Sequence, residues 1–237
     1  MKVCHRTHQG LVRANNQDAL VLDEGVYGVA DGMGGHQGGE TASRVAAQVL
    51  KNALHGKKLD ARAMEMAIEA ANRRVFDMAR HDSSLSGMGT TITLLWEGDG
   101  QLMIGHVGDS RAYRLHEGSL QQVTEDHSVV AELLRNHVIT AEMARTHPYR
   151  NVITRAVGVD PAVTPDVLCL DKCAGDVWLV CSDGLYNMVP DDTIFQTLSQ
   201  SSSDEEAADQ LLKLALDAGG ADNITFLIGR VGEVSKP

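Results

Sequence analysis

The sequence has few cysteines for its length of 237 residues. The four present, Cys4, Cys169, Cys173 and Cys181, are too few and too unevenly spaced for a disulfide framework. Cys169 and Cys173 are four positions apart, but no second Cys or His pair at a zinc-like spacing accompanies them. We therefore predict that all four are reduced packing residues.

Long apolar runs are also missing. No run approaches the roughly 18 apolar residues of a transmembrane helix. Residues 1–8 contain no apolar core of the signal-peptide kind. We therefore expect a soluble, cytoplasmic protein with no membrane partner.

Positive charge is in deficit, since 21 Lys and Arg residues face 32 Asp and Glu residues, for a net charge of -11. Nucleic-acid backbones need a basic face, so we expect no nucleic-acid partner. The acidic excess is compatible with metal binding, although solvated acidic surfaces are its commoner cause. The length and the 43% apolar content fit one large domain that buries a sizeable core.

Several common catalytic motifs do not occur. There is no GxxxxGK[ST] loop, no GxSxG elbow and no HExxH helix, which argues against P-loop, serine-hydrolase and zincin chemistry. Residues 32–39 are rich in glycine before a predicted helix, a setting in which a helix N-terminus can bind phosphate. Because the spacing misses GxGxxG, we do not expect nucleotide binding.

Helical and strand-like periodicities both occur. Apolar residues recur at helical spacing over 42–53 and 64–78. A third helix is predicted after Ser203, which forms a capping-box pattern with Glu206. The strand-like runs are 19–22, 26–30, 90–96, 102–107, 112–115, 177–181 and 224–228. Because these runs cluster in hairpins, they favour antiparallel sheets with helices packed outside.

Aspartates recur at the ends of the predicted strands. Three of them follow an apolar strand and are succeeded by Gly or Ser, and a fourth precedes a strand. Any one alone would be an ordinary turn residue. The four are Asp31, Asp109, Asp183 and Asp222.

Convergence of these strand ends would create a metal site. Like charges in a partly buried site repel and need a cation to stay ionised. Mg²⁺ and Mn²⁺ suit sites made of carboxylate and carbonyl oxygens. A small residue such as Gly32 after Asp31 would let the backbone approach the ion closely. The sequence therefore predicts a multi-carboxylate metal site.

Short elements follow one another in a specific order along nearly the whole chain. They are Arg-Ala-Asn-Asn-Gln-Asp at 13–18, Asp-Gly-Met-Gly-Gly-His at 31–36, Gly-Met-Gly-Thr-Thr at 87–91, Val-Gly-Asp-Ser-Arg at 107–111, Asp-His-Ser at 126–128, Ser-Asp-Gly-Leu at 182–185 and Ala-Asp-Asn-Ile-Thr at 221–225. In these elements the sequence resembles the metal-dependent protein phosphatases, the PPM or type 2C family, in their compact bacterial form. Residues 139–158 resemble the mobile flap of that family.

The resemblance implies an α+β fold, a four-layer α-β-β-α sandwich with two central antiparallel sheets flanked by helices. It implies that residues 1–237 form a single catalytic domain of a protein-serine/threonine phosphatase. Two Mn²⁺ or Mg²⁺ ions would occupy the core site, with a weaker third. A water bridging the metals would attack phosphorus. The implied partners are phosphorylated proteins and a cognate Ser/Thr protein kinase.

The resemblance also implies roles for single residues at the metal core. Asp31 would bridge the two metals, and the Gly32 carbonyl would bind the second. Asp183 and Asp222 would hold the first, assisted by Asp18 through water.

Further roles implied by the resemblance lie around that core. Asp109, together with Asp183, would form the third site, and Arg13 would grip the substrate phosphate. Gln17 stands where many relatives have Glu, which removes a charge near the water shell. For His36, two roles stay open, as general acid for the leaving oxygen or as a hydrogen-bonding residue of the glycine loop.

Three other polar residues are predicted to be structural. His106 lies within a strand and is expected in the core or on a sheet face. Asp126 is expected to be a turn residue, and His147 to be structural or at the edge of the substrate.

Two alternative functions remain open from the sequence. The fold can serve as a non-catalytic phosphoprotein-binding module, or as a two-metal hydrolase of small phosphate esters. The complete aspartate set favours an active phosphatase over the first, and the acidic surface gives the second no support.

Overall fold

Two antiparallel sheets form the centre of the structure, a computed structural model that describes residues 1–35 and 37–232. Along the first sheet the strands are β1 (Lys2–His8), β11 (Ile224–Arg230), β10 (Val177–Cys181), β7 (Arg111–His116) and β8 (Ser119–Gln122). Along the second they are β2 (Asp18–Asp23), β3 (Val26–Met33), β5 (Ile92–Glu97), β6 (Gln101–Val107) and β9 (Asp166–Asp171), with β4 (Gly89–Thr90) paired to β3.

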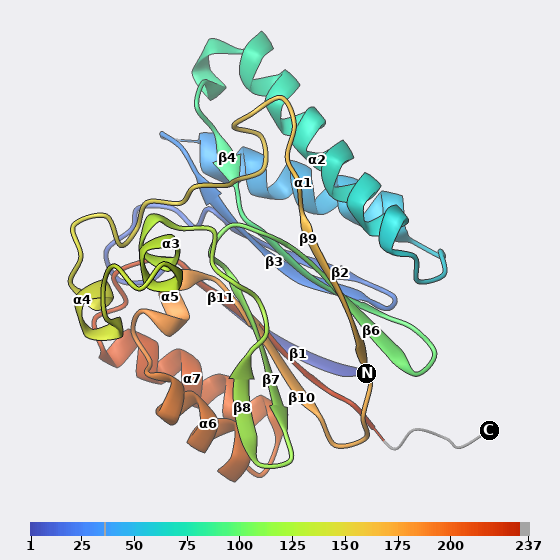
Figure 1. Cartoon of the computed structure of the whole chain (residues 1–237), viewed down its shortest axis with the longest axis vertical. Coiled ribbons are helices and arrows are strands. Elements are labelled where there is room, and N and C mark those ends of the chain that lie inside the picture. The colour runs from blue at the N-terminus through green and yellow to red at the C-terminus, as the bar shows by residue number, and fades with distance from the viewer. Residues whose placement is uncertain (36, 233–237) are drawn as a thin grey trace.

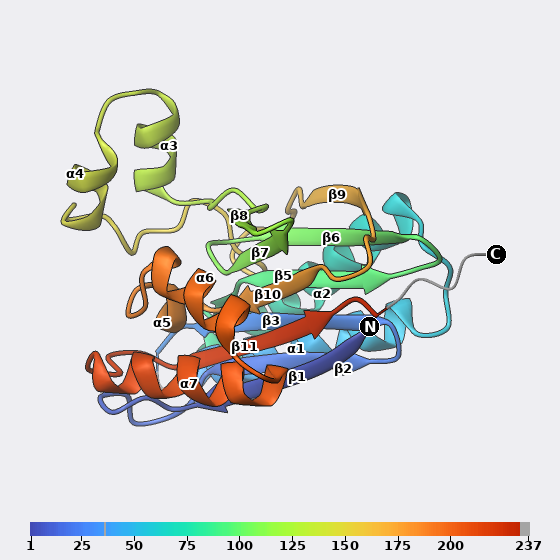
Figure 2. The same cartoon turned by 90° about the horizontal axis from the view of Figure 1, so that it is seen from below.

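Helices cover the outer face of each sheet (Figure 1). Against the second sheet lie α1 (Gly38–Leu54) and α2 (Ala61–His81). Against the first lie α5 (Asp183–Tyr186), α6 (Asp191–Gln200) and α7 (Asp204–Asp217). A 3-10 turn, η1 (Ser83–Leu85), follows α2, and the short helices α3 (Val129–Arg135) and α4 (Ala141–Arg145) project from one end of the sheets (Figure 2).

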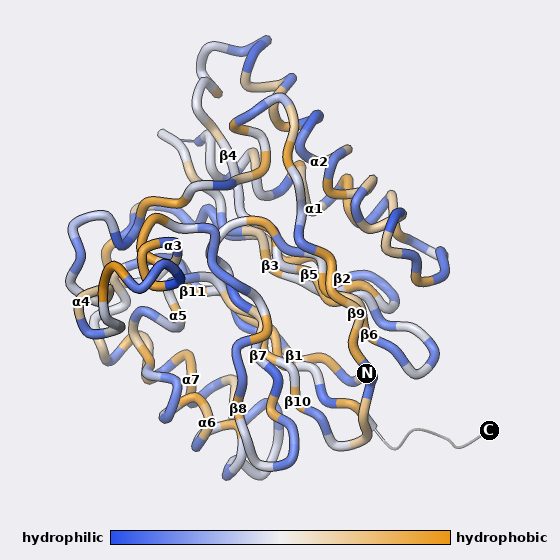
Figure 3. Tube along the Cα trace, viewed as in Figure 1, coloured by the Kyte–Doolittle hydropathy of each residue, from blue (hydrophilic) through white to orange (hydrophobic). Residues whose placement is uncertain are grey.

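Three hydrophobic clusters separate the four layers. Buried residues of α1 and α2, such as Leu50 and Ile68, pack on the second sheet. Leu211 of α7 and Phe226 pack in the corresponding cluster against the first sheet. The third cluster lies between the sheets and includes Trp178. Figure 3 shows the same division, with hydrophilic segments concentrated on the outer helix surfaces and loops.

The predicted α-β-β-α arrangement is confirmed, and every strand pair among the described residues is antiparallel. Each predicted strand and helix is present. The run 90–96 is divided into β4 and β5, and β3 continues past its predicted end through Asp31 to Met33. None of the described helices has the length and apolar character needed to cross a membrane.

The missed strands β1, β8 and β9 are all edge strands. Edge strands are polar on the exposed side, and β1 buries only Cys4, so no apolar alternation marks it.

The prediction that all four cysteines are packing residues is wrong in part. Cys4 and Cys181 are buried, but Cys169 on β9 is exposed and Cys173 is half-buried, with all four free.

Candidate metal centre

Asp18 and Asp31 face each other across a hairpin. The antiparallel register of β2 and β3 pairs these two residues. The backbone N–H of Asp31 donates to Thr91 Oγ1 at 2.9 Å, and the Thr90 hydroxyl donates to the Asp31 carbonyl oxygen at 2.9 Å. These bonds fix the backbone of Asp31, so its position is set by strand pairing and not by a flexible turn.

Asp183 and Asp222 come from the other sheet. Asp183 starts α5 directly after β10, and Asp222 lies just before β11. The two segments touch at Gly184, where a Cβ atom would lie 2.0 Å from the carbonyl oxygen of Asn223, so only glycine fits. The close contact brings the two carboxylates to the same end of the sandwich.

A hydrogen bond joins the two halves of the site. The Ser182 hydroxyl, from the first sheet, donates to Asp18 Oδ2 at 2.8 Å. The Asn223 side chain accepts from the backbone N–H of Gln17 at 2.8 Å and donates to the carbonyl of Asn15 at 2.9 Å. Asn223 therefore anchors the segment that leads into Asp18, a role that the sequence did not reveal.

The carboxylates strongly disfavour one another's charge. Burial raises the pKa of Asp31 well above its ordinary value, and the charges of Asp18, Asp183, Asp109 and Asp222 raise it further. Burial, then Asp109, Asp222 and Asp18, raise the pKa of Asp183 to about 8. The charges of the four other aspartates therefore act on Asp31, as expected for carboxylates that share one end of the sandwich.

The pKa values of the two outer aspartates rise for partly different reasons. Burial raises the pKa of Asp18 to about 6, although hydroxyl groups such as that of Ser182 oppose the shift. Burial, then the charge of Asp126, raises the pKa of Asp109 to about 6. Each carboxylate is thus costly to ionise without a positive partner.

The residues present fit a hard divalent cation. Asp18 Oδ1 is buried and has no hydrogen-bond partner among the described residues. An unpartnered carboxylate oxygen in an all-oxygen cluster is what Mg²⁺ or Mn²⁺ satisfies. Gly32, the residue after Asp31, allows the backbone of Gln17 to approach closely, since a Cβ on Gly32 would lie 2.4 Å from the carbonyl oxygen of Gln17.

Arg13 reaches into the same cluster from the β1–β2 loop. Its Nη2 atom lies 2.7 Å from Asp222 Oδ2, and its side chain is 54% exposed. The hydrogen bond to Asp222 and the charges of Asp222, Asp183 and Asp31 raise the pKa of Arg13, against the effect of burial. The structure therefore places the positively charged guanidinium of Arg13 at the exposed side of the aspartates.

Asp109 is held by a stack that the sequence did not predict. The Tyr186 hydroxyl donates to the Asp109 carbonyl oxygen at 2.9 Å, and the Arg111 guanidinium lies 3.7 Å from the centre of the Tyr186 ring. Arg111 also donates from Nε and Nη2 to Asp126. Asp126 is thus a largely buried counter-ion and not merely a turn residue. The position of Asp126 in the Asp-His-Ser element at 126–128 did not indicate this pairing with Arg111.

Two stacked histidines support the loop before Asp109. His106 is buried on a strand, as predicted, and burial followed by the charge of His127 lowers its pKa to about 4. The ring centres of His106 and His127 are 4.7 Å apart. His127 Nδ1 accepts from the backbone N–H of Gly108 at 3.0 Å, so His127 is a structural residue of this loop.

Two predicted residues at the edge of the site have different outcomes. His147 Nδ1 accepts from the backbone N–H of Tyr149 at 3.2 Å, which agrees with a structural role. His36, for which a general-acid role and a structural role were both open, lies outside the described residues.

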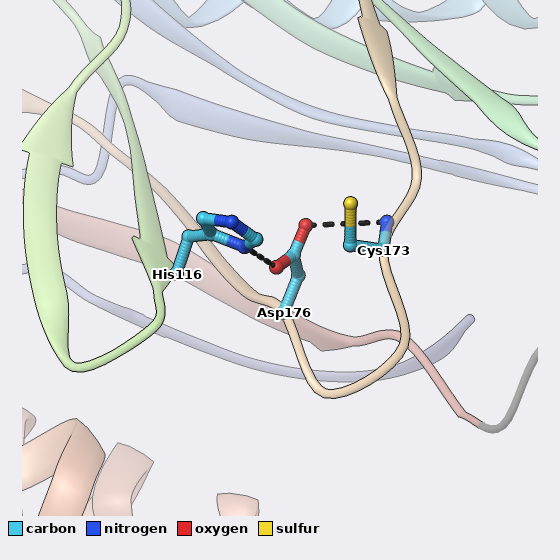
Figure 4. Close-up of side chains that lie close together, drawn as sticks. All are labelled: His116, Cys173 and Asp176. Atoms are coloured by element: carbon cyan, nitrogen blue, oxygen red, sulfur yellow. Dashed lines mark hydrogen bonds and ion pairs between the residues drawn. The ribbon is translucent and has the colours of Figure 1, made fainter.

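His116, Cys173 and Asp176 form a second group of potential metal ligands, at the turn before β10 (Figure 4). Asp176 is 1% exposed and accepts from His116 Nδ1 at 2.6 Å. Arg114 Nη2 lies 2.6 Å from the other oxygen of Asp176. Because Arg114 already neutralises Asp176, a metal ion here would bind beside a fixed positive charge. We interpret this group as an ion pair that closes the turn.

Fold and site together define an α-β-β-α protein with a carboxylate cluster, supplied by both sheets, that fits a divalent cation. The family model described as "Protein phosphatase 2C" matches residues 7–217. The chain therefore belongs to the protein phosphatase 2C family, as its sequence elements predicted.

Relatives and solved structures agree with this assignment. The chain is 38% identical over 234 residues to the serine/threonine phosphatase stp of Listeria welshimeri, with 94% of this chain and 93% of that protein covered. The crystal structure of the Mycobacterium tuberculosis serine/threonine phosphatase PstP/Ppp has a TM-score of 0.91 and 36% identity, with 98% of this chain and 99% of that chain covered. The PstP catalytic domain in complex with two manganese ions has a TM-score of 0.90 and 35% identity, with 98% of each chain covered.

Proposed function

We propose that the chain is a metal-dependent phosphatase that hydrolyses phosphoserine and phosphothreonine in proteins. The observation that carries the proposal is the buried Asp31 with four other aspartates acting on it, together with the buried, unpartnered Oδ1 atom of Asp18. The Listeria and mycobacterial relatives are named serine/threonine phosphatases, and the PstP catalytic domain binds two manganese ions.

Asp31 is the proposed ligand shared by two ions, because the other aspartates surround it. Asp183 and Asp222 would hold the first ion with help from Asp18, and the Gly32 carbonyl would hold the second. When bound, two Mn²⁺ or Mg²⁺ ions neutralise the phosphoryl oxygens and acidify a water nucleophile. Asp109 and Asp183, whose negative charges repel each other, would hold a weaker third ion.

Arg13 binds the phosphoryl group in this proposal. Its guanidinium is half exposed beside Asp222, and guanidinium groups bind phosphate oxygens through paired N–H donors. Holding the phosphate in line with the attacking water lowers the entropic part of the barrier. His36 stays a predicted general acid or loop residue.

The substrates are phosphoproteins, and the opposing enzyme is a cognate Ser/Thr protein kinase. We propose that residues 1–237 act as one catalytic domain. Its cytoplasmic location stays a prediction.

A Mn²⁺ titration of phosphate release from phosphoserine, phosphothreonine and phosphotyrosine peptides, with ATP for comparison, tests the proposal. We expect turnover of the first two peptides, which Asp31→Asn abolishes. The matched control is Asp99→Asn, because Asp99 is exposed on the turn between β5 and β6. Absence of turnover in protein shown to bind Mn²⁺ would contradict the proposal, and faster hydrolysis of ATP would favour a small-ester hydrolase.

A further inference from the structure

We propose that Leu11 and Val12 form a docking surface for apolar residues flanking the phosphorylated residue of the substrate. The inference rests on the proposed phosphatase function and specifies its substrate class. It assigns a binding role to two side chains that the metal chemistry does not use.

Both side chains are unusually exposed for their type. Leu11 is 65% exposed and Val12 is 71% exposed, the two highest values among the large apolar residues described as exposed. Scattered exposed apolar residues are ordinary, but two consecutive ones directly before Arg13 offer exposed apolar area to a chain bound at that arginine.

The loop that displays them is held rigidly from below. The backbone N–H of Leu11 donates to the Gly220 carbonyl at 2.7 Å, and a Cβ atom on Gly220 would lie 3.0 Å from Leu11 Cγ. The Gln9 side chain donates to the Arg13 carbonyl at 2.6 Å, and Asn223 donates to the Gln9 carbonyl at 2.8 Å. A surface that is already ordered loses little conformational entropy on binding.

The loop that bears Leu11 and Val12 lies next to the proposed phosphate-binding residue, Arg13. Leu11 and Val12 immediately precede Arg13, whose guanidinium contacts Asp222 of the metal centre. Consecutive Cα atoms are about 3.8 Å apart, so the two substrate residues on either side of a phosphoresidue bound at Arg13 lie within about 8 Å of that phosphoresidue. Burying apolar substrate side chains there removes the exposed Leu11 and Val12 surfaces from water.

The segment bearing α3 and α4 lies at the same end of the sheets as the β1–β2 loop (Figure 1). In Figure 2 the loop and that segment lie on opposite sides of α5, the helix that Asp183 begins. The segment also exposes apolar side chains, including Val138 at 63% and Tyr149 at 59%. A substrate chain at Asp183 therefore has an apolar surface on either side, and the experiment separates the two.

The test uses phosphothreonine peptides of one sequence with Leu, Ala or Asp on both sides of the phosphothreonine. We expect wild-type kcat/KM with Mn²⁺ to be about tenfold higher for the Leu peptide than for the Ala peptide. The double variant Leu11→Ser/Val12→Ser should lose this preference and keep its rate on p-nitrophenyl phosphate. Met66→Ser is the matched control, because Met66 is 54% exposed on α2.

Each other outcome overturns the inference. Equal wild-type rates on the Leu and Ala peptides, with both turned over, would exclude an apolar preference while leaving the phosphatase function intact. A preference that survives Leu11→Ser/Val12→Ser and is lost in Val138→Ser/Tyr149→Ser would move docking to the α3–α4 segment. A dimer dissociated by Leu11→Ser/Val12→Ser, with unchanged peptide kinetics, would assign the surface to a second copy. No turnover of any substrate would contradict the phosphatase function itself.

Discussion

The aspartates at the candidate metal centre destabilise the folded protein when they are ionised and no cation is bound. Asp31 is surrounded by other carboxylates, and the pKa of Asp183 rises to about 8. Arg13 partly offsets this repulsion from the exposed side of the cluster. The same charges that destabilise the metal-free site are those that attract a divalent ion. In our proposal Arg13 also binds the substrate phosphate, so replacing Arg13 should affect metal binding and catalysis in opposite directions.

Replacing Arg13 with Ala should weaken phosphopeptide hydrolysis and strengthen metal binding. We expect kcat/KM to fall by about tenfold or more through loss of a charge-assisted phosphate contact. The Mn²⁺ concentration for half-maximal activity should fall, because a competing cation beside Asp222 is removed. Steady-state kinetics over a Mn²⁺ series measures both, and a rise in the required Mn²⁺ would contradict this account.

His106 should make folding sensitive to acid. Its folded-state pKa is lowered to about 4 from 6.5, so the unfolded chain takes up a proton first as pH falls. Stability is therefore present above about pH 6.5 and is lost towards about pH 4, by at most about 3 kcal/mol. His106→Gln, compared with wild type by urea unfolding in EDTA, should lose less stability over this range. Parallel pH profiles would show that His106 does not contribute.

At the scale of elements, the sequence predicted the buried strands and the start of the helix α7, but it did not predict the edge strands β1, β8 and β9. The strand β10 coincides with its prediction because all five of its residues are buried and apolar. The edge strand β8 reads Ser-Leu-Gln-Gln, and only pairing with β7 makes it a strand. The capping-box prediction for α7 is confirmed in its Ser203 half, since Ser203 Oγ accepts from the Glu206 N–H at 3.1 Å. The Glu206 carboxylate instead accepts from Ser202, at 2.7 Å from its backbone nitrogen.

Removal of the α7 cap should affect stability and leave catalysis unchanged. Ser203→Ala should lower the free energy of unfolding by about 1 kcal/mol, because an N-terminal N–H loses its acceptor. The activity with Mn²⁺ should not change, since the capped end of α7 lies beside Cys4 and Arg230, whereas Asp222 follows the opposite end of the helix. Ser199→Ala, at an exposed position on α6, is the control. Equal unfolding midpoints for the two variants would show that the cap contributes nothing.

At the scale of the whole molecule, the metal centre connects the two sheets. Asp18 and Asp31 belong to the second sheet, whereas Asp183 and Asp222 flank strands of the first. Between the sheets lies an apolar cluster around Trp178, and the Ser182–Asp18 hydrogen bond joins them at the metal centre. A cation bound by these aspartates would therefore stabilise both sheets, beyond its effect on one loop.

Metal removal should destabilise the protein in a pH-dependent way. The pKa of Asp183 is raised to about 8 from 3.8, so the folded metal-free protein holds a proton that the unfolded chain releases. Metal-free stability should therefore decrease as pH rises from about 4 through about 8. Because binding Mn²⁺ displaces that proton, the Mn²⁺-induced rise in Tm should be larger at about pH 8.5 than at about pH 6. Thermal melts with EDTA and Mn²⁺ measure it, and an equal rise at both pH values would contradict it.

The sequence by itself determined the family, the buried strands and the amphipathic helices, and it predicted the aspartates of the candidate metal centre. Those features depend on local periodicity and on short elements in a fixed order, which a linear chain displays directly. Only the tertiary structure decided which polar groups support the site. Asn223 reaches the β1–β2 loop, and Arg111 pairs with Asp126 while stacking on Tyr186, across gaps of 15 residues or more. These contacts depend on how strands, loops and helices that are distant in the sequence pack together, and no local pattern in the chain records that packing.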